Sequence, residues 1–66
     1  MNAMRFIGTD GYCCGFRFEH GTVYLVDARR SGYIDCSISA VITDGYEEVR
    51  IPYSSWESFY ANWEHV

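Results

Sequence analysis

Three cysteines and one histidine, residue types well suited to binding a metal ion, lie close together in this 66-residue chain: Cys13, Cys14, His20 and Cys36. Zn²⁺ in a structural site takes four ligands in a tetrahedral arrangement and prefers thiolate sulfur and imidazole nitrogen. A chain this short also gains from a metal, because its hydrophobic core is small and stabilises the fold only weakly. We therefore predict a zinc site at these four residues that supports the fold.

The spacing of the four residues, C-C-x5-H-x15-C, is not one of the common zinc-finger patterns. Neighbouring residues of an extended strand point to opposite faces, so Cys13 and Cys14 can share an ion only if they lie in a turn. Gly11 and Gly15, on either side of the pair, favour such a turn. The other candidate ligands are Asp10, Asp35, His65 and a residue of a partner chain.

An alternative interpretation of the cysteines needs no metal. Cys36 alternates with Ile34 and Ile38 on the expected core face of a strand, where a free cysteine packs as a small apolar residue. His20 precedes a glycine and fits an ordinary turn. On this interpretation the thiols are buried or idle.

The same residues do not form a recognisable catalytic pattern. A cysteine nucleophile needs a base, and His20 is the only histidine near the cysteines in the sequence. The carboxylates follow no known catalytic spacing, and no glycine-rich loop resembles a phosphate-binding loop. Such a short chain also has little volume for a substrate pocket. We therefore expect a protein that is not an enzyme.

Short runs of β-branched and aromatic residues, separated by glycine and Asp-Gly turns, predict an antiparallel sheet. The predicted strands span residues 3–7, 22–26, 34–42 and 47–51, with a brief extended segment at 16–18. The segments expected between them are an irregular stretch at 12–15, a polar hairpin loop at 27–32 and a two-residue Asp-Gly turn within 43–46. Pro52 is expected to end the hydrogen-bond ladder of the last strand.

The end of the chain changes to a helical period. Ser54 and Glu57 fit a capping box, in which their side chains bind the free amides at the start of a helix. Aromatic residues follow at helical spacing and predict a helix whose aromatic face covers the sheet: Trp56, Phe59, Tyr60 and Trp63. We expect a single α+β domain, mainly β, over residues 1–66. A small SH3-like barrel is the first choice, and an antiparallel meander of four to five strands with one C-terminal helix is the second.

Composition and charge limit the partners. A hydrophobic fraction of 48% and an aromatic fraction of 18% are typical of a folded protein. The net charge of −4, with five arginines and no lysine, disfavours direct binding to nucleic acid, including single strands. No apolar run approaches the roughly 18 residues of a membrane helix, and the start has no apolar block typical of a signal peptide. Three cysteines cannot form a complete set of disulfides, so we expect a protein of the reducing cytosol.

Three segments of the chain resemble small phage and prophage proteins of Gram-positive bacteria: residues 4–8, residues 20–26, and residues 52–57 with Trp63 and Glu64. Such proteins include anti-CRISPR proteins that bind and inhibit Cas9, and this chain looks most like a zinc-binding member of that class. The pair Cys13-Cys14 departs from the wider pattern. The resemblance implies a phage accessory protein that acts in the cytosol of the bacterial host.

The leading hypothesis is therefore an anti-CRISPR protein that binds Cas9 through an acidic and aromatic surface. The partner-binding residues expected near turns are Tyr12, Tyr33, Tyr46, Glu47 and Glu48. The alternative is a phage structural or regulatory module that binds proteins, self-associates as a homodimer, and has buried free cysteines and no metal.

Overall fold

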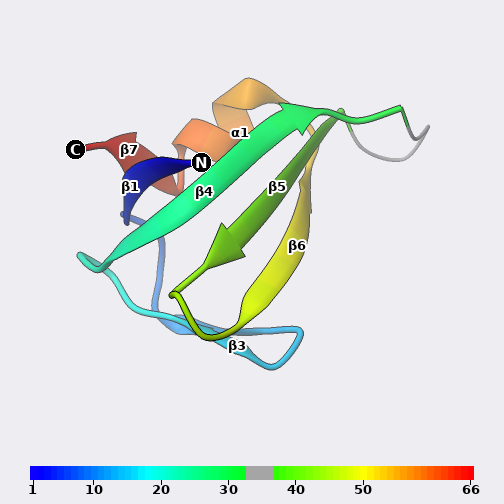
Figure 1. Ribbon diagram of the computed structural model, residues 1–66. Helices are drawn as coiled ribbons and strands as arrows, with labels where there is room; N and C mark the ends of the chain where they lie inside the picture. Colours follow the sequence, from blue (N-terminus) through cyan, green and yellow to red (C-terminus); the bar gives the residue numbers. More distant parts are fainter. Residues whose placement is uncertain (33–36) are drawn as a thin grey trace.

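The computed structural model describes residues 1–32 and 37–66 of the chain (Figure 1). Its elements in chain order are β1 (Asn2–Phe6), β2 (Gly11–Cys13), β3 (Phe16–Phe18), β4 (Val23–Arg30), β5 (Ile38–Thr43), β6 (Glu48–Tyr53), α1 (Trp56–Tyr60) and β7 (Trp63–His65). Among the described residues, five strands form an antiparallel sheet in the order β6-β5-β4-β1-β7, called the main sheet below, while β2 and β3 form a separate hairpin. The predicted residues Tyr33 and Cys36 lie outside the described residues.

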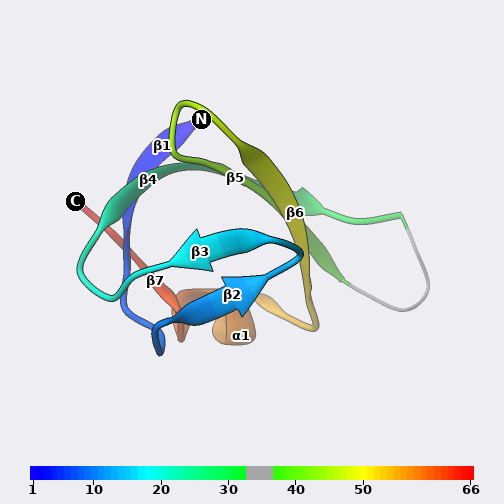
Figure 2. The same ribbon diagram turned by 90° about the horizontal axis from the view of Figure 1, so that it is seen from below.

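The main sheet is curved, and its concave face holds the core. The β2–β3 hairpin lies at one end of the concave face and α1 at the other (Figures 1 and 2). The alternation predicted for the long strand is confirmed in β5, where Ile38, Ala40 and Ile42 are almost fully buried. Aromatic rings fill the space between sheet, hairpin and helix: Phe6, Phe16, Phe18, Tyr24, Phe59 and Trp63.

The mainly β fold, with an antiparallel sheet and a short helix near the C-terminus, is confirmed. The main sheet does not close into a barrel, because β6 and β7 remain its two edges. No helix in the described part of the chain is both long enough and apolar enough to cross a membrane.

Two segments predicted as irregular or loop are strands instead. Tyr12 pairs with Arg17, so the stretch expected to be irregular forms half of the small hairpin. The other is the end of β4, where Asp27 faces Val41 and Arg29 faces Ser39 across the ladder with β5. The polar residues in this part of β4 alternate onto the solvent side of an antiparallel sheet, a pattern that is compatible with a strand. Their polarity alone had suggested a loop.

The prediction that Pro52 ends the ladder is wrong, since it lies within β6 opposite Ser39. An edge strand tolerates proline because one side of its backbone needs no partner. The Asp-Gly turn is also longer than predicted: Thr43 pairs with Glu48, which leaves four residues, 44–47, in the loop.

The helix is shorter than the aromatic spacing predicted. It ends at Tyr60, and Trp63 belongs to β7, where it pairs with Phe6 of β1. Phe59 and Trp63 are each only 1% exposed, whereas Trp56 and Tyr60 are 38% and 45% exposed, so half of the predicted stripe faces solvent. The capping residue is Ser55, whose hydroxyl accepts the Ser58 amide, and not the predicted Ser54.

Candidate functional site

The first candidate site is the pair of cysteines at the tip of the β2–β3 hairpin. Cys14 and Gly15 occupy the two central turn positions with φ of 56° and 80°, the positive values that a type I′ turn requires. Gly15 adopts this conformation freely. Within residues 1–32 and 37–66, Cys14 is the only non-glycine residue at positive φ. Both thiols are exposed, and their Sγ atoms lie 3.6 Å apart. The predicted turn therefore exists and brings the two sulfurs together.

The neighbouring Cys14 thiol affects the ionisation of Cys13. The hydrogen bond with Cys14, partial desolvation and repulsion from the neighbouring sulfur raise the pKa of Cys13 above its ordinary value. The Cys13 thiol therefore resists ionisation at neutral pH. A cation held between the sulfurs would favour the thiolate forms.

His20 does not join the cysteines in this structure. It follows β3 by two residues, at the end of the hairpin opposite to the tip that holds Cys13 and Cys14. Its Nδ1 lies 3.0 Å from the Gly8 carbonyl oxygen, and its backbone amide donates to the Asp10 carboxylate. Within residues 1–32 and 37–66, no three histidine, cysteine or acidic side chains are grouped closely enough to hold a metal ion. The alternative of buried thiols fails for Cys13 and Cys14, which are exposed.

The second candidate site is the β5–β6 loop, residues 44–47, together with Glu48 at the start of β6; we call these five residues the acidic loop. Both of its ends are fixed by side chains: the Thr43 hydroxyl donates to the Glu47 carbonyl at 2.7 Å and accepts the Gly45 amide at 3.0 Å. Asp44 Oδ1 accepts the amides of Tyr46 at 2.8 Å and Glu47 at 2.9 Å. The amides of Glu47 and Tyr46 hold the pKa of Asp44 below its usual range. These bonds fix the loop in one conformation.

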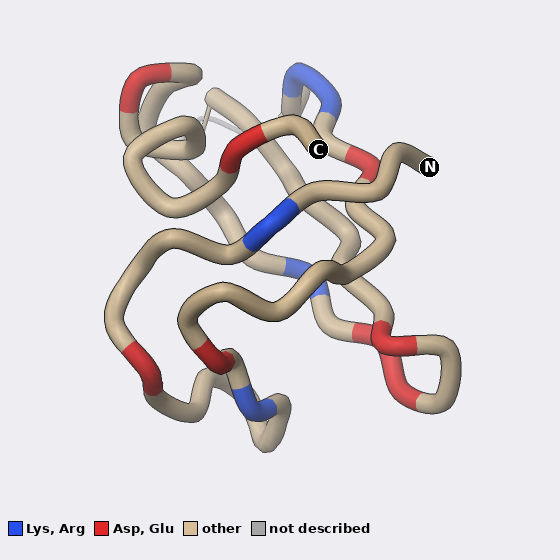
Figure 3. Tube along the Cα trace, turned by 90° about the vertical axis from the view of Figure 1, so that its left-hand side faces the viewer, with Lys and Arg blue, Asp and Glu red and all other residues tan. Residues whose placement is uncertain are grey.

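The acidic loop presents three of the predicted partner-binding residues together. Tyr46 is 96% exposed, and Glu47 and Glu48 beside it are exposed. Figure 3 shows acidic positions next to one another on this loop, which projects from the body of the protein, while other acidic positions are spread along the rest of the chain. Sequence reasoning missed Asp44, whose role as a turn acceptor was implied by its position after Thr43 and before glycine.

Tyr12 belongs to a different surface from Tyr46. It lies on β2 next to the cysteine pair and is 74% exposed. The guanidinium carbon of Arg17 lies 5.9 Å from the centre of its ring, a cation–π contact across the small hairpin. Tyr33, the remaining predicted anchor, lies outside the described residues.

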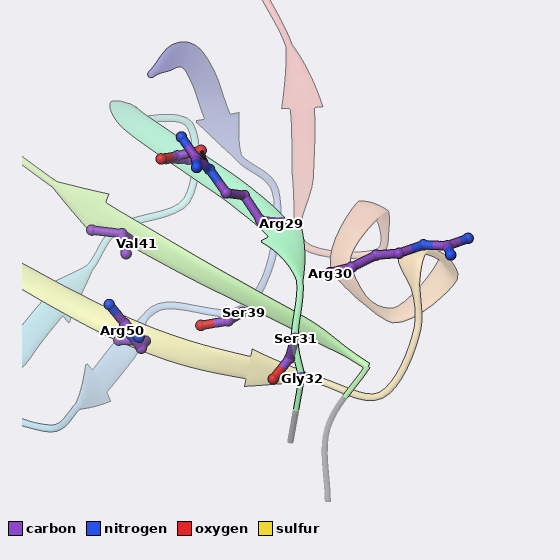
Figure 4. A pocket seen from close by; sticks show the side chains of 8 residues that line it. Arg29, Arg30, Ser31, Gly32, Ser39, Val41 and Arg50 are labelled. Carbon is purple, nitrogen blue, oxygen red and sulfur yellow. Dashed lines mark hydrogen bonds and ion pairs between the residues drawn. The ribbon is translucent and has the colours of Figure 1, made fainter. Parts of the chain in front are cut away.

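A depression of about 410 Å³ lies on the outer face of the main sheet, lined by Asp27, Arg29, Arg30, Ser31, Gly32, Ser39, Val41 and Arg50 (Figure 4). Arg29 is paired with Asp27 at 3.1 Å, and Figure 4 shows Arg30 directed away from the other lining side chains. Arg50 forms no ion pair with any described residue, and its guanidinium can donate hydrogen bonds to a carboxylate or phosphate. The sequence did not predict this depression, because its arginines come from separate strands and residues 27–32 were expected to be a loop.

Comparison of this chain with protein families, with curated proteins and with solved structures found no match. The resemblance to phage-encoded Cas9 inhibitors is therefore untested and stays a prediction.

Proposed function

We propose that this protein is a non-enzymatic binding module that docks the acidic loop on a basic surface of a partner protein. The observation that carries the proposal is the exposure of Tyr46, at 96%, on a loop held by side-chain hydrogen bonds. Tyrosine is enriched at the centres of protein interfaces, where its large ring adds contact area with only two rotatable side-chain bonds.

The fixed conformation of the loop favours binding. Association normally orders flexible loops at a cost in free energy, and a loop that is already ordered avoids much of it. Asp44 and Thr43 make four hydrogen bonds that hold Gly45, Tyr46 and Glu47 before any partner arrives. The tyrosine ring is thus presented to the partner with its backbone already in place.

The charge of the acidic loop selects the chemistry of the partner. Asp44, Glu47 and Glu48 contribute three carboxylates within five residues, in a chain of net charge −4. The loop contains no basic residue, while Arg50 lies in the β6 strand that follows it. Such a surface attracts basic proteins and speeds their encounter, and it repels nucleic acid. A protein with an exposed lysine- and arginine-rich groove is the expected partner class.

Cas9 is the first partner to test, because of the sequence resemblance to phage proteins and because a nuclease that binds nucleic acid has a basic channel. On this proposal the protein acts in the host cytosol as an anti-CRISPR inhibitor, without a reaction of its own and without contacting nucleic acid directly. The acidic loop would compete with nucleic acid for the channel.

The proposal is tested by mixing the purified protein with Cas9, with and without guide RNA, and measuring capture and DNA cleavage. We expect stoichiometric capture, reduced cleavage, and slower association for the double variant Glu47→Gln/Glu48→Gln. Glu57→Gln, which removes an exposed carboxylate from α1, is the matched control and should associate like the wild type. Unimpaired cleavage at a large molar excess of the protein rejects Cas9 as the partner.

A further inference from the structure

The two sulfurs at the hairpin tip have the separation that a tetrahedral metal site requires. Cys13 Sγ and Cys14 Sγ lie 3.6 Å apart. A zinc ion about 2.3 Å from both sulfurs would have a sulfur–zinc–sulfur angle of about 103°. This value follows because the sine of half the angle is half the sulfur–sulfur separation divided by the zinc–sulfur distance. This angle is close to the tetrahedral value of about 109°. The pair can therefore bind one ion without moving its side chains apart or together.

A disulfide within the pair is the competing use of these sulfurs, and the backbone opposes it. Adjacent Cα atoms joined by a trans peptide lie about 3.8 Å apart, below the roughly 4.4–6.8 Å that disulfides normally span. The described peptide bonds include no cis bond. The pair is thus better suited to share a cation than to oxidise.

The site is incomplete within the described part of one chain. Structural zinc takes four protein ligands, and the hairpin tip supplies two. No third histidine, cysteine or acidic side chain of the described residues is grouped with the pair. The His20 ring lies beyond the opposite end of the hairpin, beside Gly8. The residues that the structure describes thus leave half of the coordination sphere to be filled.

The hairpin tip is accessible to a second copy of the chain. Cys13, Cys14 and Gly15 are all exposed, and Tyr12 beside them is 74% exposed. A two-fold axis through the ion would bring an identical pair of sulfurs to the two empty positions, as in closed symmetric dimers. The net charge of −4 per chain opposes this approach, and physiological salt screens much of that repulsion.

We propose that two copies of this protein share one Zn²⁺ ion, coordinated by Cys13 and Cys14 of each copy, and thereby form a metal-linked dimer. The four thiolates form a Cys₄ site of the kind found in structural zinc centres. Metal binding releases the thiol protons to solvent, so no oxidant or other reactant is needed. This site differs from the one predicted from the sequence, in which His20 and Cys36 of the same chain were the other two ligands.

The test combines metal analysis with light scattering on the full chain, kept reduced with a phosphine and freed of metal beforehand. Added zinc should double the molar mass and bind at half an ion per chain, and a chelator should restore the monomer. Substituting Co²⁺ should give the strong sulfur-to-metal absorption of a four-thiolate site. Cys13→Ser and Cys14→Ser should each abolish dimer and absorption, with circular dichroism showing that the fold is retained.

His20→Gln is the matched control, because it removes a predicted ligand that lies away from the tip, and it should dimerise with zinc like the wild type. Three results would overturn the proposal: one zinc ion per chain in a monomer, a dimer that forms equally without metal, or no uptake of zinc by the reduced protein. None of these outcomes bears on the acidic loop, so the proposed function stands or fails separately.

Discussion

Trp63 of β7 donates its indole Nε1–H to the hydroxyl of Tyr53 of β6 at 3.0 Å, which joins the two edge strands of the main sheet. Backbone hydrogen bonds would close a barrel at this point, and here a side-chain bond links the edges instead. Phe59 of α1 packs against both rings, with centroid distances of 5.3 Å to Tyr53 and 6.4 Å to Trp63. The helix thus covers the opening between the edges.

Tyr53→Phe should destabilise the protein by about 1–3 kcal/mol, because Trp63 is 1% exposed and its N–H would lose its partner without gaining water. Chemical denaturation measures the change in free energy of unfolding. Tyr60→Phe is the matched control. Tyr60 is 45% exposed, and removing its hydroxyl should change the free energy of unfolding by no more than about 0.5 kcal/mol. Equal effects of the two variants would show that the Tyr53 bond contributes nothing of its own.

The same tyrosine makes stability depend on alkaline pH. Burial raises the pKa of Tyr53, the hydrogen bond from Trp63 lowers it, and the negative charge of Cys13 raises it further, with a net upward shift. The folded state therefore holds the phenol proton more tightly than the unfolded state, whose tyrosines ionise near pH 10. This contribution is complete below about pH 10 and is lost as pH rises through the folded value. Denaturation midpoints measured between about pH 9 and about pH 11 should fall less steeply in Tyr53→Phe than in the wild type. Parallel slopes would refute this assignment.

Ser55→Ala should cost about 1 kcal/mol, because the Ser55 hydroxyl caps α1 by accepting the Ser58 amide at 3.2 Å. Ser54→Ala is the control, since the exposed Ser54 hydroxyl bonds to the Ser58 hydroxyl at 2.9 Å and to no backbone amide of the described helix. Its effect on unfolding should stay below about 0.5 kcal/mol. A larger loss for Ser54→Ala would restore the capping box that the sequence predicted.

Asp44→Ala should loosen the acidic loop while leaving the melting temperature nearly unchanged. The substitution removes the acceptor of the Tyr46 and Glu47 amides, and hydrogen exchange at these two amides should become faster. Glu48→Gln, which changes a neighbouring carboxylate but neither bond, should leave both exchange rates as they are.

Lowering the pH should loosen the acidic loop of the wild type in the same way as Asp44→Ala does. The folded pKa of Asp44 is lowered, so its contribution to order is present above the ordinary value of about 4 and is lost as pH falls through the folded value. Protection of the two amides that is equal in Asp44→Ala and the wild type would contradict the role given to Asp44.

The sequence predicted the parts of the fold that depend on local patterns. The alternation of Ile38, Ala40 and Ile42 marked a strand with one buried face, and the structure has it. Neither the place of Pro52 nor that of Trp63 was predictable, because each depends on a distant strand. Pro52 fits within β6 because β6 is an edge, and Trp63 leaves the helical pattern because it pairs with Phe6.

In the candidate sites too, local features were predictable from the sequence and contacts between distant residues were not. Gly15 indicated the turn that brings the sulfurs of Cys13 and Cys14 together, and that turn is a local property. The position of His20 depends on a contact with Gly8, twelve residues earlier in the chain, which no spacing rule contains. Tyr46 was identified from its turn, whereas the near-complete exposure of its ring follows from the whole loop.

The central claim, that Tyr46 on the acidic loop anchors a protein partner, is tested most directly by calorimetric titration of Cas9 with the wild type and two tyrosine variants. Tyr46→Ala should weaken binding at least about 30-fold, which corresponds to the 2 kcal/mol or more of an interface anchor. Tyr60→Ala, which removes a half-exposed ring from α1, should bind within about twofold of the wild type. Equal affinity of Tyr46→Ala and the wild type, or no binding by any of the three proteins, would contradict the claim.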